Sequence, residues 1–265
     1  MKPRSNGRAF ADLCSPEVHD AVEAQTLVWP VGSIEQHGPH LPLSVDLVIA
    51  EAFAQQIARE LAAFALPVQP VAARSLPQSG GGLAFPGTVF VRGGTLIDFL
   101  ADTIRSLCAL PVRRLLIVNG HFENEPFVFE ALDQIACERA GHEPELIALS
   151  WWSLVDDGWL RARLPAFPGW HAEHGGLTET SLMLYLRPDL VTASRPCHDD
   201  PPRPGIYLHP ADTASTTNNG VLSSTTGANA ELGEELFWHV VGNAMALVTG
   251  GHGLLRPSPA ERTRP

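Results

Sequence analysis

The sequence has little basic charge, few cysteines and no long hydrophobic run. Its 265 residues include 18 Lys and Arg against 29 Asp and Glu, which gives a formal net charge of −11. Basic residues cluster only as short pairs such as Arg113-Arg114. Nucleic acids and anionic membranes bind concentrated basic charge, so the composition argues against both as partners.

Two further absences in the sequence bear on where in the cell the protein is expected. Residues 1–14 contain no apolar segment of the kind that a secretion signal requires, and no uninterrupted apolar stretch is long enough to span a bilayer. The 4 cysteines are scattered with no C-x-x-C spacing, which predicts reduced and mostly buried thiols. We therefore expect a soluble cytoplasmic protein.

Short apolar runs alternate with helical spacing along the chain. The runs predict strands at 26–31, 67–72, 115–118 and 145–150, and the spacing predicts helices at 46–63, 95–107, 124–140 and 229–248, with another starting after residue 176. This alternation predicts the α/β class, with one three-layer α/β/α domain over residues 1–250 and a mainly parallel central sheet. Residues 251–265 have the composition of a disordered tail.

Local signals refine the helix starts and one loop. Thr95 and Asp98 match a capping box, and Asn124 is a candidate cap for the helix that follows it. Residues 199–226 are rich in Pro, Asn, Thr and Gly and show no periodicity, which predicts a long structured loop. Loops of this length often serve function or assembly.

Carboxylates and imidazoles follow two of the predicted strands. Glu35 and His37 come after the strand at 26–31, and His121 and Glu123 come after the strand at 115–118. Residues at i and i+2 in an extended chain point to the same face, so each pair can hold an ion. Ligands of open α/β sheets bind at the carboxyl ends of the strands, which is where these pairs lie.

Asp46 completes a set of five possible ligands with no cysteine nearby. Mixed imidazole and carboxylate ligands suit Zn²⁺, Mn²⁺ or Fe²⁺. Five ligands exceed what one tetrahedral catalytic zinc takes, but they serve two ions if Asp46 bridges them. An isolated His after a strand is more often a turn or capping residue, and we prefer that interpretation for His40. For the five together we prefer a metal site, because three buried carboxylates would otherwise lack partners.

Other residues predict a substrate pocket. Residues 79–82 read Ser-Gly-Gly-Gly, but the Gly-Lys-Ser/Thr ending of a phosphate-binding loop is absent, which favours a substrate loop. Tryptophan usually supplies core area, and that interpretation covers Trp159 and Trp151, whereas Trp152 and Trp170 are better pocket candidates. His174 can shuttle protons because its ordinary pKa lies near neutrality, or it can pack at a helix start.

Several of these motifs resemble the creatininase family of metal-dependent amidohydrolases over about residues 28–248. The matching segments are Gly-Ser-Ile-Glu-Gln-His-Gly at 32–38, Ser-Gly-Gly-Gly at 79–82, Phe-Pro-Gly-Thr at 85–88, Asn-Gly-His-Phe-Glu-Asn at 119–124 and Gly-Trp-His-Ala-Glu-His-Gly-Gly at 169–176. Much of the family has Gly-Gly where this chain has Phe122-Glu123. In this respect the chain is similar to the family members in which this Glu is a metal ligand.

The resemblance implies a role for each candidate residue. Glu35, Asp46 and His121 would hold one ion, and His37, Asp46 and Glu123 the other, with Zn²⁺ or Mn²⁺ the expected metals. His174 and Glu173 would be catalytic, with His174 moving a proton and Glu179 behind the site. The implied substrate pocket is Ser79, Trp152, Trp170 and Phe122. The family also implies a homohexamer.

The function expected from these residues is hydrolysis of a small cyclic amide by a hydroxide that bridges two ions. Reversible opening of creatinine to creatine is the leading expectation. A formamide, another lactam-like ring or a peptide end is the alternative substrate, and a metal-binding protein without turnover is the alternative class.

Overall fold

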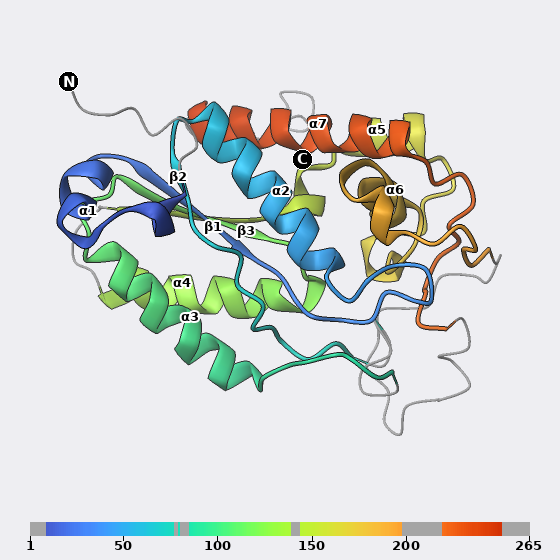
Figure 1. Ribbon diagram of the computed structural model, residues 1–265, viewed down its shortest axis with the longest axis horizontal. Helices are drawn as coiled ribbons and strands as arrows, with labels where there is room; N and C mark the ends of the chain where they lie inside the picture. Colours follow the sequence, from blue (N-terminus) through green and yellow to red (C-terminus); the bar gives the residue numbers. More distant parts are fainter. Residues whose placement is uncertain (1–8, 77–78, 80–84, 139–143, 198–218, 251–265) are drawn as a thin grey trace, which may run out of the picture.

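The computed structural model describes residues 9–76, 79, 85–138, 144–197 and 219–250, and a parallel four-stranded sheet is at its centre (Figure 1). The strand order is β2-β1-β3-β4, with β1 at Thr26–Val31, β2 at Phe64–Ala65, β3 at Arg114–Asn119 and β4 at Glu145–Ser150. Val31 pairs with Asn119, and Asn119 pairs with Ser150. Three strands therefore end at the same level.

Helices cover both faces of the sheet (Figure 1). One face carries α2 (Val45–Glu60), α6 (Leu177–Leu186) and α7 (Ala230–Thr249), and the other carries α1 (Ser15–Val22), α3 (Gly93–Cys108) and α4 (Glu125–Glu138). The shorter elements are η1 (Phe10–Asp12), η3 (Phe122–Asn124), η4 (Trp151–Leu154), α5 (Asp157–Arg163), η5 (Trp170–Ala172) and η6 (Pro188–Leu190). The predicted α/β/α layering around a parallel sheet is confirmed.

Alternating residues of each strand enter the two cores. In β3, Leu115 and Ile117 pack with α3 and α4, whereas Leu116 and Val118 pack with α2 and α7, and all four are fully buried. Burial on both faces explains why these strands read as continuous apolar runs. Among the described helices, none is both long and apolar enough to cross a membrane.

The strand predicted at 67–72 is wrong. The regular pairing with β1 is limited to Phe64–Ala65; after Leu66 N donates to Val28 O, the next donor to β1 is Gln69 rather than Val68, so the register is lost, and Pro70 has no N–H with which to continue the ladder. Gln69 still bonds to β1: its N–H donates to Pro30 O at 3.1 Å, and its carbonyl accepts from Gly32 N at 3.1 Å. The segment therefore follows β1 as an irregular edge.

Two predicted helix caps are also wrong. Helix α3 begins at Gly93, so Thr95 lies inside its first turn, and no side chain caps it. Gly93 lies against Phe127, where an added Cβ would come within 2.5 Å of the ring. The Asn124 side chain instead accepts from Ala73 N at 2.9 Å and donates to Gly32 O at 3.2 Å. This asparagine therefore ties two segments to the end of β1.

The remaining expectations for helices and loops are mostly confirmed. Helices 46–63 and 229–248 correspond to α2 and α7, and Asn229 caps α7 by accepting from Leu232 N at 2.9 Å. The predicted end of α4 at 140, the tail at 251–265 and residues 199–218 of the predicted loop lie outside the described residues. Residues 219–226 form neither helix nor strand.

Replacing Asn124 by Ala should destabilise the fold. The change leaves Ala73 N and Gly32 O buried without their partner, which costs about 2 kcal/mol or more of unfolding free energy. Denaturant unfolding of both proteins measures the difference. Gln134→Ala, on the exposed face of α4, is the control and should change stability by about 0.5 kcal/mol or less; equal effects of the two changes would contradict this account of Asn124.

Candidate metal centre

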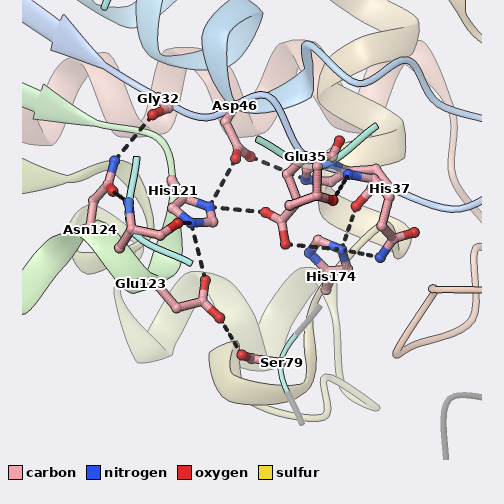
Figure 2. Close-up of polar contacts among 12 residues, drawn as sticks. Gly32, Glu35, His37, Asp46, Ser79, His121, Glu123, Asn124 and His174 are labelled. Carbon is pink, nitrogen blue, oxygen red and sulfur yellow. Dashed lines mark hydrogen bonds and ion pairs between the residues drawn. The ribbon is translucent and has the colours of Figure 1, made fainter. Parts of the chain in front are cut away.

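Five predicted ligands gather where β1 and β3 end (Figure 2). Asp46 comes from the first turn of α2. Two glycines let that turn approach the strand ends: an added Cβ on Gly32 would lie 2.9 Å from Asp46 O, and one on Gly120 would lie 2.5 Å from it. Any larger residue at these positions would push Asp46 away, so the glycines help to set the position of its carboxylate.

The Asp46 carboxylate lies between two imidazoles. Its Oδ1 is 3.1 Å from His37 Nε2, and its Oδ2 is 3.0 Å from His121 Nδ1. Glu35 Oε2 is 2.9 Å from the same His121 nitrogen. One carboxylate that faces two separate histidines is the arrangement that a bridging ligand needs.

The buried atoms at this centre fit divalent cations. Glu35, His37, Asp46 and His121 are at most 2% exposed. Glu35 Oε1, His37 Nε2 and Asp46 Oδ2 form ion pairs within the cluster but no hydrogen bond of normal geometry among the described residues. A buried polar atom without a hydrogen bond is costly, and carboxylate and imidazole ligands together are suited to Zn²⁺ or Mn²⁺.

Three groups of side chains offer ligand atoms within 4.8 Å of one another among the described residues: Glu35, Asp46 and His121; His37, Asp46 and Glu179; and Glu35, His37 and His174. The first is the set that the family resemblance implies for one ion. In the second, Glu179 stands where the resemblance implies Glu123.

Glu123 lies beside His121, and Glu179 lies beside His37. Glu123 Oε2 is 3.4 Å from His121 Nε2, and its Oε1 accepts from Leu76 N at 3.2 Å and from the Ser79 hydroxyl (Figure 2). Glu179 Oε1 is 3.7 Å from His37 Nε2, and its Oε2 accepts from Gly175 N at 2.6 Å. Glu179 is therefore close enough to join the ligands directly.

The charges at the centre favour ionised Glu35 and Asp46 carboxylates and protonated imidazoles, whereas burial raises the pKa of the Glu123 carboxyl. Burial opposes ionisation of Asp46, but His37 and His121 hold the pKa of its carboxyl well below the usual range. Burial lowers the pKa of His37, but Asp46 and Glu179 raise it by more, so that it lies well above the usual value. The pKa of His121 is raised in the same way by Glu35 and Asp46 against burial.

Metal binding should therefore release protons. A histidine ligand is neutral, so an ion must displace the protons that His37 and His121 hold. We expect roughly two protons released per chain near neutral pH and an affinity for Mn²⁺ that falls as the pH falls. Calorimetric titration in buffers of different ionisation enthalpy measures the release; binding without proton release would contradict this assignment of charge.

His174 and Glu173 lie beside the cluster on separate hydrogen bonds. His174 Nε2 is 2.8 Å from Gln36 O and 3.9 Å from Glu35 Oε1, and its ring centre is 4.4 Å from that of His37. Glu173 accepts from Thr178 N at 2.7 Å, from Thr178 Oγ1 at 2.6 Å and from the Ser223 hydroxyl. Burial, and then Glu179, raise the pKa of the Glu173 carboxyl, which favours its protonated form.

The predicted pocket residues line one small cavity with the candidate ligands. Ser79, Phe122, Trp152, Trp170, Glu173 and His174 all border it, and its volume is about 20 Å³. The Phe122 and Trp152 rings are 5.6 Å apart, and Phe122 is 44% exposed at the rim. Trp151, interpreted from the sequence as a core residue, is 2% exposed but also borders the cavity. This volume holds about one water.

Three residues that the sequence did not assign to the site also belong to its surroundings. Glu179 was expected behind the site. Its place in the first turn of α6, just after Gly175-Gly176, was a signal that its carboxylate approaches the ligands more closely. His171, next to Trp170, borders the cavity and is exposed. Gln36, between two candidate ligands, contacts His174.

Comparison with known proteins identifies the family of the chain. The sequence profile of the creatininase family, described as creatinine amidohydrolase, matches residues 11–248. Creatinine amidohydrolase of Pseudomonas putida is 40% identical over 215 residues, which cover 78% of this chain and 82% of that protein. A mycofactocin precursor peptide peptidase of Mycolicibacterium smegmatis is 32% identical over 219 residues, which cover 80% of this chain and 79% of the peptidase.

Solved structures match over nearly the whole chain. A mutant creatininase complexed with creatine aligns with a TM-score of 0.85 and 34% identity, covering 92% of this chain and 98% of that one. A creatininase structure with Mn aligns with a TM-score of 0.84, the same identity and the same coverage, and one of Zn-Zn type aligns at 0.82 and 32% identity over 93% and 99% of the two chains. The chain is therefore a member of the creatininase family.

Proposed function

We propose that the protein hydrolyses creatinine to creatine, and catalyses the reverse reaction, in a site that holds two divalent metal ions. The observation that carries this proposal is the Asp46 carboxylate, 3.1 Å from His37 and 3.0 Å from His121. A relative that is 40% identical is a creatinine amidohydrolase. That identity supports creatinine as the substrate.

The residues that would hold the ions divide around Asp46. Glu35, Asp46 and His121 would hold one ion, and His37 and Asp46 the other. Glu123, the ligand implied by the family resemblance, and Glu179, which lies 3.7 Å from His37, are the candidates to complete the set. Ions bound here would acidify a water molecule and polarise the amide carbonyl.

The chain's own groups would bind the ring and move its proton. Phe122 and Trp152 would stack on the flat ring, with Trp170 and Ser79 bordering it. His174, one residue from Glu173, would protonate the ring nitrogen as the amide bond breaks. Phe122, which is 44% exposed, borders the side of this cavity from which a creatinine ring would enter.

NMR-detected conversion of creatinine tests this function. The purified protein is stripped of metal, reloaded with Mn²⁺ or Zn²⁺ and compared with the chelated sample. We expect creatine to form only in the reloaded samples, and creatinine to form when creatine is supplied. A metal-loaded protein that leaves creatinine unchanged would refute the substrate assignment.

A peptide end is the second candidate substrate, and a larger cavity favours it. This cavity, of about 1030 Å³, shares Glu173 with the metal cavity and is also bordered by Phe167, Leu177, Leu222 and Ser223. It has room for several residues of a peptide, and one relative is a peptide peptidase. Short peptides, formamides and other lactams, assayed in parallel with creatinine, separate these substrates; inertness toward all of them would favour a metal-binding protein without turnover.

We also propose a homohexamer. Large apolar side chains stay exposed on the described surface, among them Val89 (57%), Phe129 (48%) and Trp238 (47%). Subunit contacts would bury such side chains. Light scattering on the purified protein should give six times the chain mass of 28.6 kDa, and a monomeric mass would contradict the proposal.

A further inference from the structure

Gln36 holds the imidazole of His174 on one side. The Gln36 carbonyl oxygen is 2.8 Å from His174 Nε2, and the Gln36 side-chain Nε2 is 3.0 Å from the same ring nitrogen. A carbonyl can only accept and an amide N–H can only donate. Gln36 therefore offers a partner to this ring nitrogen whether or not the nitrogen carries a proton.

The Gln36 side chain is itself held at both ends. Its Nε2 donates to Gly220 O at 2.9 Å, and its Oε1 accepts from Gly38 N at 2.9 Å. Gln36 is 5% exposed and His174 is 7% exposed. A buried amide with these bonds has one orientation, so the contact with His174 is fixed rather than one of several alternatives.

Gly220 leaves the space that this orientation needs. Its φ is +86°, and an added Cβ would lie 1.9 Å from Gln36 Oε1 and 2.4 Å from Gln36 Cδ. The same segment bonds to the histidine directly, because Leu222 N donates to His174 O at 2.9 Å. A side chain at position 220 would therefore displace the Gln36 amide that contacts His174.

We infer that Gln36 is a positioning residue for His174, and that Gly220 is required to keep Gln36 in place. The inference rests on the proposed function of His174 in proton transfer. Gln36 lies between Glu35 and His37 in the sequence, so it also connects the orientation of His174 to the backbone that carries two candidate ligands. A small displacement of an acid or base can reduce the rate about a hundredfold.

Two single variants and their combination test the coupling. The Mn²⁺-loaded full chain is assayed as wild type, Gln36→Ala, Gly220→Ala and the double variant. We expect each single change to lower kcat about 10- to 100-fold, with KM changed about threefold or less and with bound metal unchanged. The collision disappears with the amide in the double variant and only the strain of a side chain at φ +86° is left, so its kcat should lie within about threefold of that of Gln36→Ala alone.

Gly227→Ala is the matched control for the glycine change, since its φ of +88° resembles that of Gly220 and the nearest atom to a Cβ added there is Leu177 Cδ1 at 3.9 Å. Its kcat should equal that of the wild type. If the loss of kcat in the double variant equalled the product of the losses in the two single variants, the inference would be overturned, because the two residues would then not act through one contact. Wild-type kcat in Gln36→Ala, together with inactive His174→Ala, would overturn it and leave the proposed function intact.

A crystal structure of Gln36→Ala provides a readout that does not depend on the substrate. We expect the His174 ring to rotate or to occupy several orientations. An unchanged ring would overturn the inference even if creatinine is not the substrate. Full turnover in His174→Ala would instead overturn both the proposed function of His174 and the inference that depends on it.

Discussion

Replacing Asp46 by Asn should abolish metal binding and lower the rate of creatinine hydrolysis about a thousandfold or more. The side chain keeps its shape but loses the negative charge that faces His37 and His121 at 3.1 Å and 3.0 Å. Both proposed ion sites include this carboxylate, so one substitution should empty both. Metal content per chain and kcat, measured on the same preparation, check the prediction.

Asp133→Asn on the exposed face of α4 is the matched control for Asp46→Asn. It removes the same charge from the chain far from the candidate ligands and should keep full metal content and activity. Retention of both ions in Asp46→Asn would contradict the bridging position of Asp46.

The second large effect is expected for His174→Gln. General acid–base catalysis contributes about 10²- to 10⁴-fold, so kcat should fall by that factor. The metal content should not change, because Glu35, His37, Asp46 and His121 are all still present. Steady-state kinetics and metal analysis on one sample separate loss of proton transfer from loss of the ions.

His19→Gln, at an exposed histidine of α1, is the control for this change. It should leave kcat unchanged. If His174→Gln lost its metal together with its activity, His174 would be a ligand, as its place in a group with Glu35 and His37 allows. Wild-type kcat in His174→Gln would refute its part in the reaction.

The strands and the first ligand set were predictable because their signals are local. The bounds of β1 and β4 are those that the apolar runs gave, and β3 extends its run by one residue at each end. Glu35 and His121 were predicted in one site because parallel strands end at one edge of the sheet, and their grouping with Asp46 on one ion was implied by the resemblance to the creatininase family. Their distances follow from that topology and from the glycines that admit α2.

Other features depend on contacts between distant segments, which a local pattern cannot reveal. Asn124 has the sequence context of a helix cap, but its amide is used to bond Ala73 and Gly32. Glu179 comes close to His37 only because α6 packs against α2. Gln36 is adjacent to two predicted ligands, yet its contact is with His174, 138 positions away.

The irregular segment beside β1 shows a different limit of predicting strands from an apolar pattern. Residues 67–72 alternate in a way that suggests a strand, and Gln69 does bond to β1 on both sides. The pairing slips here, because Leu66 N donates to Val28 O and the next donor to β1 is Gln69 N, to Pro30 O, so three residues of this segment span two of β1.

Anomalous diffraction from crystals grown with Mn²⁺ tests the central claim most directly. The account predicts two peaks that share Asp46, one next to Glu35 and His121 and the other next to His37, both absent from Asp46→Asn crystals. A single peak, or two peaks of which only one contacts Asp46, would contradict a centre built from two ions and one bridging carboxylate.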